Sequence, residues 1–481
     1  MSTNRWLILV IACLAQFMVV LDATIVNVAL PSIQRGLHFS PADLQWVVNA
    51  YTLIFGGFLL LGGRAADLLG RKRLFAAGIA LFSAASLLNG LAQSSGMLIF
   101  GRGLQGLGGA LVSPAALSII TTTFTDNEDR TKALGVWSAI AAGGGAVGLL
   151  LGGVLTDLAS WPWIFIVNVP VGIAALVLTF RYIPESRVET EHRSFDLAGA
   201  VTVTSGLVVL VYAIVKAQAF GWGSARTIGL MAAGAALIAV FVAIERRSVA
   251  PLVRLSIFRV RTLTAADIVL LLVASGMFGM FFFASLYVQE ILGYSPLKAG
   301  LAFLPITVGI VIGAGIAQQL IKRIGVRNVS LVGIALATAG LVVLTQLPVH
   351  GSYVGDLLTG LMPLSIGMGL VFVPITLLGT GGVSEDDAGL ASGLFNTAQQ
   401  VGGSLGLAIL STLAASQTSS LLDAGHSGSA SVLAARVSGY HVAFAAAAVM
   451  LAAGGVILAV MVRRSDERQL NTDLASAAVP A

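Results

Sequence analysis

Fourteen apolar runs, each long enough to cross a lipid bilayer as a helix, divide this chain from one end to the other. A membrane-spanning helix needs about 20 mostly apolar residues. In lipid, backbone polar groups must bond within the segment, so spans of this length are helices. The sequence therefore predicts an all-α integral membrane protein with 14 transmembrane spans, at about 7–30, 44–62, 74–93, 97–122, 133–158, 163–183, 197–217, 227–245, 263–288, 299–320, 328–347, 353–379, 388–415 and 440–462.

Composition excludes the soluble classes. Of the 481 residues, 57% are hydrophobic and only 10% are charged, whereas soluble domains carry about 25% charge. Cys13 is the single cysteine, so no intrachain disulfide forms. The sequence has no P-loop, metal-ligand cluster or nucleophile triad. We therefore expect no enzyme activity, cofactor or metal, and the net charge of +5 does not indicate nucleic acid because the basic residues lie in short loops.

The basic residues indicate orientation. Loops on the side of the two termini hold 21 of the 27 Lys and Arg residues, the opposite side holds five, and Arg102 lies inside a span. Loops rich in Lys and Arg stay in the cytoplasm. The bias predicts a multi-pass protein of the cell (inner) membrane with both termini cytoplasmic.

The chain also repeats itself. Segment 126–148 matches segment 384–406 at a constant offset of 258, which aligns an acidic pair and several glycines. Duplicated halves are common in secondary transporters, with the substrate site at the repeat interface. We expect a six-helix half at 1–183, a linker with two inserted spans and a cytoplasmic interfacial segment at 184–262, and a second six-helix half with a tail at 263–481. The outer loop 416–439, rich in Ser, Ala and Gly, is expected to be loose.

Five residue strings resemble one transporter family. They are LDATIVNVALPSI (21–33), GRAADLLGRKR (63–73), GRGLQGLGGALVSPAAL (101–117), GGAVGLLLGG (144–153) and WPWIFIVNVPVG (161–172). Together with the span count they resemble the major facilitator superfamily, and within it the fourteen-span drug:proton antiporters of the EmrB/QacA type. The resemblance implies the major facilitator fold and export of small, amphipathic or cationic drug-like molecules by alternating access. Leu149 stands where the antiporter motif usually has Pro.

Two charged residues lie inside the spans. Asp22 is about eight residues from the expected outer end of span one, or roughly 12 Å deep, and Arg102 is at a similar level in span four. Intramembrane charges are functional candidates by default, so we expect Asp22, Arg102 and Gln105 to couple transport to protons. The alternative is a structural acid and a structural clamp.

The loop between spans two and three carries an expected cytoplasmic gate, formed in the resembled family by residues equivalent to Gly63, Asp67, Gly70, Arg71 and Arg73. Its basic residues also fix topology, which is the alternative reading. The resemblance further assigns helix packing to the span-five motif, Gly144, Gly148, Gly152 and Gly153.

Further candidates are less specific. The substrate-cavity candidates, which pair adaptable apolar side chains with uncharged hydrogen-bond partners, are Asn27, Met277, Phe278, Phe281, Asn396 and Gln399. Asp267 and Asp356 are secondary acidic candidates for a proton or cation site, or else helix-end acids facing water.

Three other functions stay open: a dedicated exporter of an endogenous metabolite or antibiotic, a transporter-like membrane sensor or scaffold, and a channel. The expected partners are a small-molecule substrate, protons and the bilayer, with no nucleic acid. We expect a monomer driven by the proton gradient without a cofactor.

Overall fold

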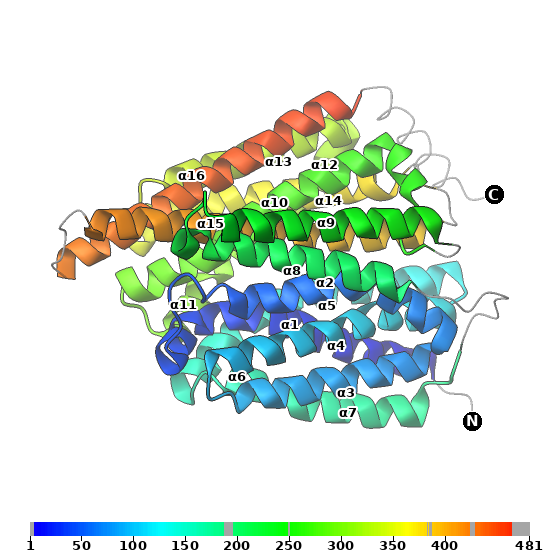
Figure 1. Cartoon of the computed structure of the whole chain (residues 1–481). Coiled ribbons are helices and arrows are strands. Elements are labelled where there is room, and N and C mark those ends of the chain that lie inside the picture. The colour runs from blue at the N-terminus through cyan, green and yellow to red at the C-terminus, as the bar shows by residue number, and fades with distance from the viewer. Residues whose placement is uncertain are drawn as a thin grey trace. The chain divides into compact units, whose positions relative to one another are not determined.

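The computed structural model describes residues 4–186, 196–248, 251–381, 383, 387–423 and 429–463 (Figure 1). In these residues 14 helical stretches are long and apolar enough to cross a membrane, which confirms the predicted count and the all-α class. The elements are α1 (Arg5–Leu37), α2 (Trp46–Leu69), α3 (Arg71–Gly90), α4 (Ser95–Thr123), α5 (Asn127–Leu158), α6 (Trp163–Ile166), α7 (Asn168–Tyr182), α8 (Leu197–Phe220), α9 (Ala225–Arg247), η1 (Leu255–Arg259), α10 (Arg261–Leu286), η2 (Tyr287–Ile291), α11 (Pro296–Ala302), α12 (Leu304–Ile324), α13 (Val326–Leu344), η3 (Tyr353–Leu357), α14 (Leu358–Thr380), α15 (Ala388–Asp423) and α16 (Ser429–Met461).

Several spans are interrupted. The sixth consists of α6 and α7, and the tenth of α11 and α12. The ninth span continues from α10 into the π-helical turn η2, and the twelfth begins with the π-helical turn η3. Single π-helical turns break the regular hydrogen-bond ladder of a helix.

The expectation of a loose loop at 416–439 was wrong for residues 416–423 and 429–439, while 424–428 lie outside the described residues. The helix α15 runs on to Asp423 and α16 begins at Ser429. The two helices pack closely there, because a methyl carbon added at Gly439 would lie 2.4 Å from Thr418 Oγ1 and 2.6 Å from the carbonyl oxygen of Ala414. Small Ala, Ser and Gly residues favour such packing, so their abundance marks a helix contact.

Some predictions fall outside the described residues. They concern the basic residues Arg187 and Arg193 of the linker, the repeated acid Asp386, and the basic residues Arg464 and Arg468 of the C-terminal tail. The expected interfacial segment is described in part, as the short 3-10 helix η1 with Ile257 buried.

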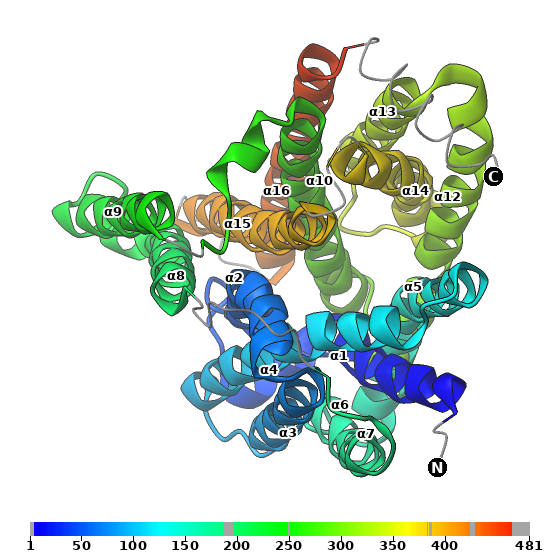
Figure 2. The ribbon, with the colours of Figure 1, turned by 90° about the vertical axis from the view of Figure 1, so that its right-hand side faces the viewer.

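The chain forms two compact units. Unit 1 contains 1–216, 220–252 and 293–304, and unit 2 contains 217–219, 253–292 and 305–481. Within unit 1, α1 packs on α5, and α4 packs between α2 and α3 (Figure 2). Within unit 2, α10 packs on α15 and α16, and α13 packs on α14 (Figure 2).

The inserted helix α8 belongs to unit 1, where it lies against the start of α2. The amine of Lys216 donates to Asp43 Oδ1 at 2.7 Å, and the rings of Trp46 and Tyr212 are 6.4 Å apart. Farther along, a methyl carbon added at Gly57 would overlap the Thr204 hydroxyl. An ion pair, an aromatic contact and a glycine contact therefore dock the insert on α2.

The sequence repeat has a structural counterpart. A methyl carbon added at Gly148 of α5 would meet Thr24 and the Leu21 carbonyl of α1. One added at Gly406 of α15 would meet Ser275 of α10. The two glycines are 258 positions apart, and their partners Thr24 and Ser275 are 251 positions apart. The matched glycines thus permit the same close helix contact in each unit.

The repeated contact gives a prediction for stability. A methyl carbon at Gly402 would lie 2.2 Å from the carbonyl oxygen of Leu271, whereas no described atom lies within 4 Å of one at Gly389 on the same helix. Forcing atoms into a packed site costs about 1–3 kcal/mol, so Gly402→Ala should lower the thermal midpoint of the purified protein. The control Gly389→Ala should leave it unchanged or raise it, because Ala favours helix. Equal midpoints for the two variants would contradict the packing role.

Candidate proton-coupling site

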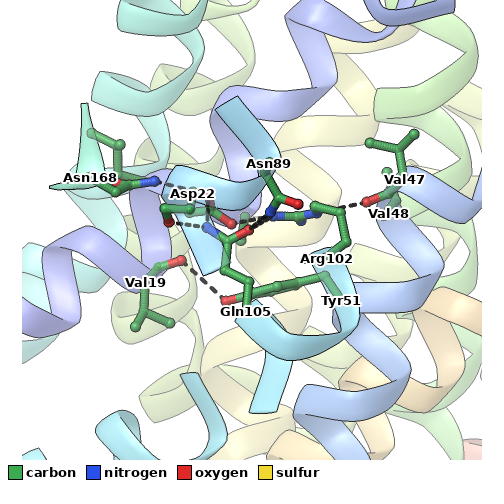
Figure 3. A network of polar contacts seen from close by, with 12 residues as sticks. Val19, Asp22, Val47, Val48, Tyr51, Asn89, Arg102, Gln105 and Asn168 are labelled. Atoms are coloured by element: carbon green, nitrogen blue, oxygen red, sulfur yellow. Dashed lines mark hydrogen bonds and ion pairs between the residues drawn. The ribbon is translucent and has the colours of Figure 1, made fainter. Parts of the chain in front are cut away.

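A buried ion pair joins α1 to α4 in unit 1. Asp22 is 0% exposed and Arg102 is 1% exposed. The guanidinium Nη1 of Arg102 lies 2.5 Å from Oδ2 of Asp22, and Figure 3 shows the two side chains in one polar network. The two charged residues that the sequence placed at a similar level are therefore in direct contact.

The second oxygen of Asp22 accepts two side-chain amides. Gln105 Nε2 donates to Oδ1 at 2.6 Å, and Asn168 Nδ2 donates to the same oxygen at 3.0 Å. Asp22 thus receives three hydrogen bonds from side chains on α4 and α7 (Figure 3). A buried carboxylate needs such donors, because burial removes its hydration.

Gln105 connects the acid to α3. Its Oε1 accepts from Arg102 Nη1 at 2.7 Å and from Asn89 Nδ2 at 2.8 Å. Its amide nitrogen lies 2.7 Å from the hydroxyl of Ser86. Arg102 and Gln105 are three positions apart on α4 and share a helix face, so both reach Asp22.

The guanidinium has further partners on α2 and α6. Arg102 Nε donates to the carbonyl oxygen of Val47 at 2.9 Å. The guanidinium carbon lies 4.4 Å from the centre of the Tyr51 ring and 5.7 Å from that of Phe165. Aromatic faces attract a desolvated cation. The positive charge therefore keeps stabilising contacts besides the one with Asp22.

Glycines in the span-four string let these short side chains meet. A methyl carbon at Gly106 would lie 2.4 Å from the carbonyl oxygen of Tyr51 on α2. One at Gly108 would lie 2.7 Å from the backbone nitrogen of Phe82 on α3. Small residues bring helix backbones close together, so α4 can lie near enough to both neighbours for Asn89 and Val47 to bond its side chains.

The span-five glycines hold α1 at the level of Asp22. A methyl carbon at Gly144 would lie 3.1 Å from Val20, one at Gly148 would lie 2.9 Å from the Leu21 carbonyl oxygen, and one at Gly152 would lie 2.6 Å from the Ile25 carbonyl oxygen. Gly153 instead faces α11, with its added carbon 2.7 Å from the Pro296 carbonyl oxygen. Leu149, which stands in place of the usual Pro, lies within the uninterrupted helix α5.

Sequence reasoning named Asp22, Arg102 and Gln105 as one site, and the structure brings them into contact. The helix α1 continues through Pro31 to Leu37, so Asp22 lies about 22 Å from the helix end at 1.5 Å per residue. Sequence reasoning missed the other partners. They are polar residues inside apolar runs, which is the signal that marks them: Tyr51, Ser86, Asn89 and Asn168.

The loop between α2 and α3 forms a second charged cluster. Asp67 accepts from Arg71 at 2.8 Å and from the Ser118 hydroxyl at 3.3 Å. Gly70 has φ 108, a backbone conformation that favours glycine. Gly63 makes only an ordinary contact, since its added carbon would be 3.6 Å from Pro114.

The sequence interpretation of this loop overlooked a second acid, Glu185. Its Oε1 accepts from the backbone nitrogen of Lys72 at 3.1 Å, and its Oε2 lies 3.5 Å from Nε of Arg73. A carboxylate at the start of a helix interacts favourably with the helix dipole. Arg73 therefore pairs with Glu185, while Arg71 pairs with Asp67.

The cavity candidates are distributed over both units. Asn27 lies in unit 1, where its amide donates to the Thr24 carbonyl oxygen of its own helix at 3.2 Å. In unit 2, Phe278 packs against Gly403, and Asn396 donates to the Ser392 carbonyl oxygen at 2.9 Å. The remaining three are half-buried in unit 2: Met277, Phe281 and Gln399.

The secondary acids have different surroundings. Asp356 is half-buried at η3, where it accepts from the backbone nitrogen of Ser352 at 2.7 Å and from its hydroxyl at 3.0 Å. Asp267 is buried in α10. Only Asp356 has the environment expected of a helix-end acid.

Comparison with known proteins matches this chain to one family. The profile described as Major Facilitator Superfamily matches residues 12–407. The puromycin resistance protein pur8 of Streptomyces alboniger is 40% identical, over 98% of this chain and 94% of its own. The cephamycin export protein CmcT of Amycolatopsis lactamdurans is 41% identical, over 85% of each chain. The multidrug resistance protein Stp of Mycobacterium tuberculosis is 36% identical, over 88% of this chain and 78% of its own.

Solved structures show the same fold. A bacterial homologue of the human lysosomal transporter Spinster, in an inward-facing and occupied conformation, superposes with a TM-score of 0.69 at 16% identity, over 96% of this chain and 98% of its own. A peptide transporter of the POT family in an autoinhibited form gives the same TM-score, identity and coverage.

The ion pair gives a prediction for stability. Removing one partner of a buried pair typically costs about 3–5 kcal/mol, because it leaves an uncompensated charge. Arg102→Met should therefore lower the thermal midpoint strongly, and adding Asp22→Asn should restore part of the loss. Arg35→Met is the control, since Arg35 is exposed and bonds only within its own helix. If the losses of the two single variants simply add in the double variant, the residues are not coupled.

Proposed function

Because this chain belongs to the major facilitator superfamily, we propose that it is a proton-coupled exporter of small drug-like molecules. The family and the 14 spans make it a multi-pass membrane transporter that binds a small-molecule substrate. The observation that supports proton coupling is the buried contact between Asp22 and Arg102. A carboxylate can gain or lose a proton, whereas a guanidinium keeps its charge, so one proton switches this ion pair off or on.

The other hydrogen bonds around Arg102 would persist when the ion pair is lost. When Asp22 takes up a proton, Arg102 loses its charged partner but keeps the Val47 carbonyl, Gln105 and the Tyr51 ring. The helices α1 and α4 then lose the strongest contact that holds them at this level. A proton from outside would in this way favour one conformation, and its release inside would restore the other.

The relatives support the substrate class. Three similar proteins are named for resistance to, or export of, puromycin, cephamycin and tetracenomycin C. We propose amphipathic or cationic molecules of this kind as substrates. The name of the cephamycin export protein also favours a second candidate, a dedicated exporter of one endogenous antibiotic. An efflux screen across unrelated dyes and antibiotics separates the two, because a dedicated exporter moves one compound class.

We also propose an orientation and a mode of operation. The distribution of basic residues supports both termini in the cytoplasm and a location in the cell (inner) membrane. Reporter fusions to the C-terminal tail test this, and a tail accessible from outside would exclude it. The proton gradient would be the only energy source, with no bound cofactor, and a monomer would suffice because the coupling network lies within unit 1 of one chain.

The cluster at Asp67 would act as the cytoplasmic gate, which gives a prediction for transport. The Asp67 side chain is 44% exposed, and ion pairs that water reaches contribute about 0–1 kcal/mol, so Asp67→Asn should change the thermal midpoint little. It should nevertheless slow ethidium efflux, because Arg71 would lose its partner in the closed state. Glu128→Gln is the matched control, since Glu128 and Lys132 form an exposed pair of the same spacing at 2.6 Å. Wild-type efflux by Asp67→Asn would show that the pair does not gate.

Proton coupling gives the sharpest prediction. Asp22→Asn keeps the size of the side chain and one oxygen that can accept from Gln105 and Asn168, but it takes up no proton, so ethidium efflux should become insensitive to the proton gradient. The assay compares wild type with Asp22→Asn in inverted vesicles over a pH series, with and without a protonophore. Asp356→Asn is the control, because Asp356 bonds to its own turn at η3. If Asp22→Asn still concentrates ethidium and a protonophore still collapses the gradient, Asp22 is not the coupling site.

A wild type that moves no dye or drug would instead favour a sensor or scaffold.

A further inference from the structure

Asp267 of α10 is a buried acid that has no hydrogen-bond partner among the described residues. It is 8% exposed, and no described group donates to either of its carboxyl oxygens. Asp22, in contrast, receives three side-chain hydrogen bonds, one of them from a guanidinium. The two buried acids therefore sit in opposite environments.

The face of α10 that carries Asp267 is the one that packs on α15. Leu271 and Ser275 follow at spacings of one helical turn, and they contact Gly402 and Gly406 of α15. Both contacts advance by four residues along each helix, so the helices run parallel. One turn earlier in the same register, Asp267 lies at the level of Ala398. By helical spacing Asp267 lies on the side of α10 that faces α15, and its burial distinguishes it from a helix-end acid facing water.

The repeat relates Asp267 to Gln16 of α1. The contacts of Thr24 and Ser275 fix an offset of 251 between α1 and α10, and the same offset pairs Gln16 with Asp267. Gln16 is 9% exposed and its Oε1 also lacks a donor. The position equivalent to Asp22 in unit 2 is Val273, six residues farther along α10, or about 9 Å. The two acids thus occupy different levels of the repeated scaffold.

Among the described residues, no charged side chain compensates Asp267. Between their first and last residues, α14 has no charged group, and α15 has only Asp423 at its far end. On α16, Arg436 pairs with Glu290, and His441 lies 2.7 Å from the Leu347 carbonyl oxygen.

The charged groups at the start of α10 are directed elsewhere. Arg261 donates to the Val460 carbonyl oxygen at 3.1 Å, and Arg254 pairs with Asp387. Arg259 and Arg463 lie at this end of the chain's unit 2 as well, and neither donates to Asp267.

We propose that Asp267 is a second proton-binding site, carried by unit 2. An ionised carboxylate here would be an uncompensated buried charge, which is far more costly than the neutral acid. The side chain accordingly holds a proton in this conformation and releases it when α10 and α15 admit water. A metal cation does not fit, because hard cations take several oxygen ligands and the described residues contain no group of three His, Cys, Asp or Glu that could bind one.

Proton binding by Asp267 does not depend on the proposed function, whereas its role in transport does. The site adds a proton to the exchange, so each transported molecule would be exchanged for protons from both Asp22 and Asp267. The position of Asp267, six residues from the start of α10, places it nearer the side of the termini than the equivalent of Asp22 would be.

The test measures the proton itself. Infrared spectra of the purified protein in lipid show the carbonyl stretching band of a protonated carboxylic acid, which is lost when the acid ionises. The wild type should show such a band at neutral pH. Asp267→Gln, which installs the residue found at the equivalent position of α1, should lack it, and Asp356→Asn should keep it. Asp267→Glu, which retains a carboxylic acid, should keep the carbonyl band but shift the frequency of that band. An unchanged band in both Asp267 variants would overturn the proposal.

A transport assay separates this inference from the proposed function. In proteoliposomes with ethidium as the probe, Asp267→Gln should move one proton fewer per ethidium than the wild type and Asp356→Asn. An unchanged proton count would overturn the role of Asp267 in exchange. If wild-type efflux does not respond to a protonophore, proton-coupled export fails, while the infrared band still decides whether Asp267 binds a proton.

Discussion

The burial of a carboxylate and a guanidinium together is the constraint on which unit 1 depends. Taking either ion out of water costs several kcal/mol, and their attraction offsets this only when further hydrogen bonds complete the site. The network around Asp22 and Arg102 meets that condition with groups from α2, α3, α4 and α7. The pair therefore fixes how several helices are rotated about their axes, and a change in its charge acts on all of them.

Close helix packing is what makes the network possible. Side chains as short as Asn and Ser reach a common centre only if the backbones lie close together, and glycines on α4 and α5 allow this. The antiporter-type motif of α5 contributes in the same way, since it seats α1 at the turn that carries Asp22. Its role in packing does not need the missing proline, because the contacts are made by the glycines.

The two units share a scaffold but differ in chemistry. Matched glycines bring α5 onto α1 and α15 onto α10, while Val273 occupies the position of Asp22 and Asp267 that of Gln16. A duplicated helix pair can thus keep its packing while its polar groups change level. Unit 2 also has an aromatic cluster, in which Phe283 contacts Tyr440 and Phe444, but it lies ten residues farther along α10 than Val273.

The sequence by itself determined the number of spans, the all-α class and the similar level of Asp22 and Arg102, because lipid accepts only long apolar helices and each helical residue advances by a fixed rise. It did not reveal Asn168, Asn89 or Glu185 as partners, nor the burial of Asp267. Those facts depend on which face each helix turns towards its neighbours, and that rotation is decided by contacts between residues far apart in the chain. Composition likewise misjudged the residues after 415, since Ser and Ala suit a loop and a closely packed helix equally well. Only the tertiary structure distinguishes them, because close packing is a property of two helices and not of one sequence segment.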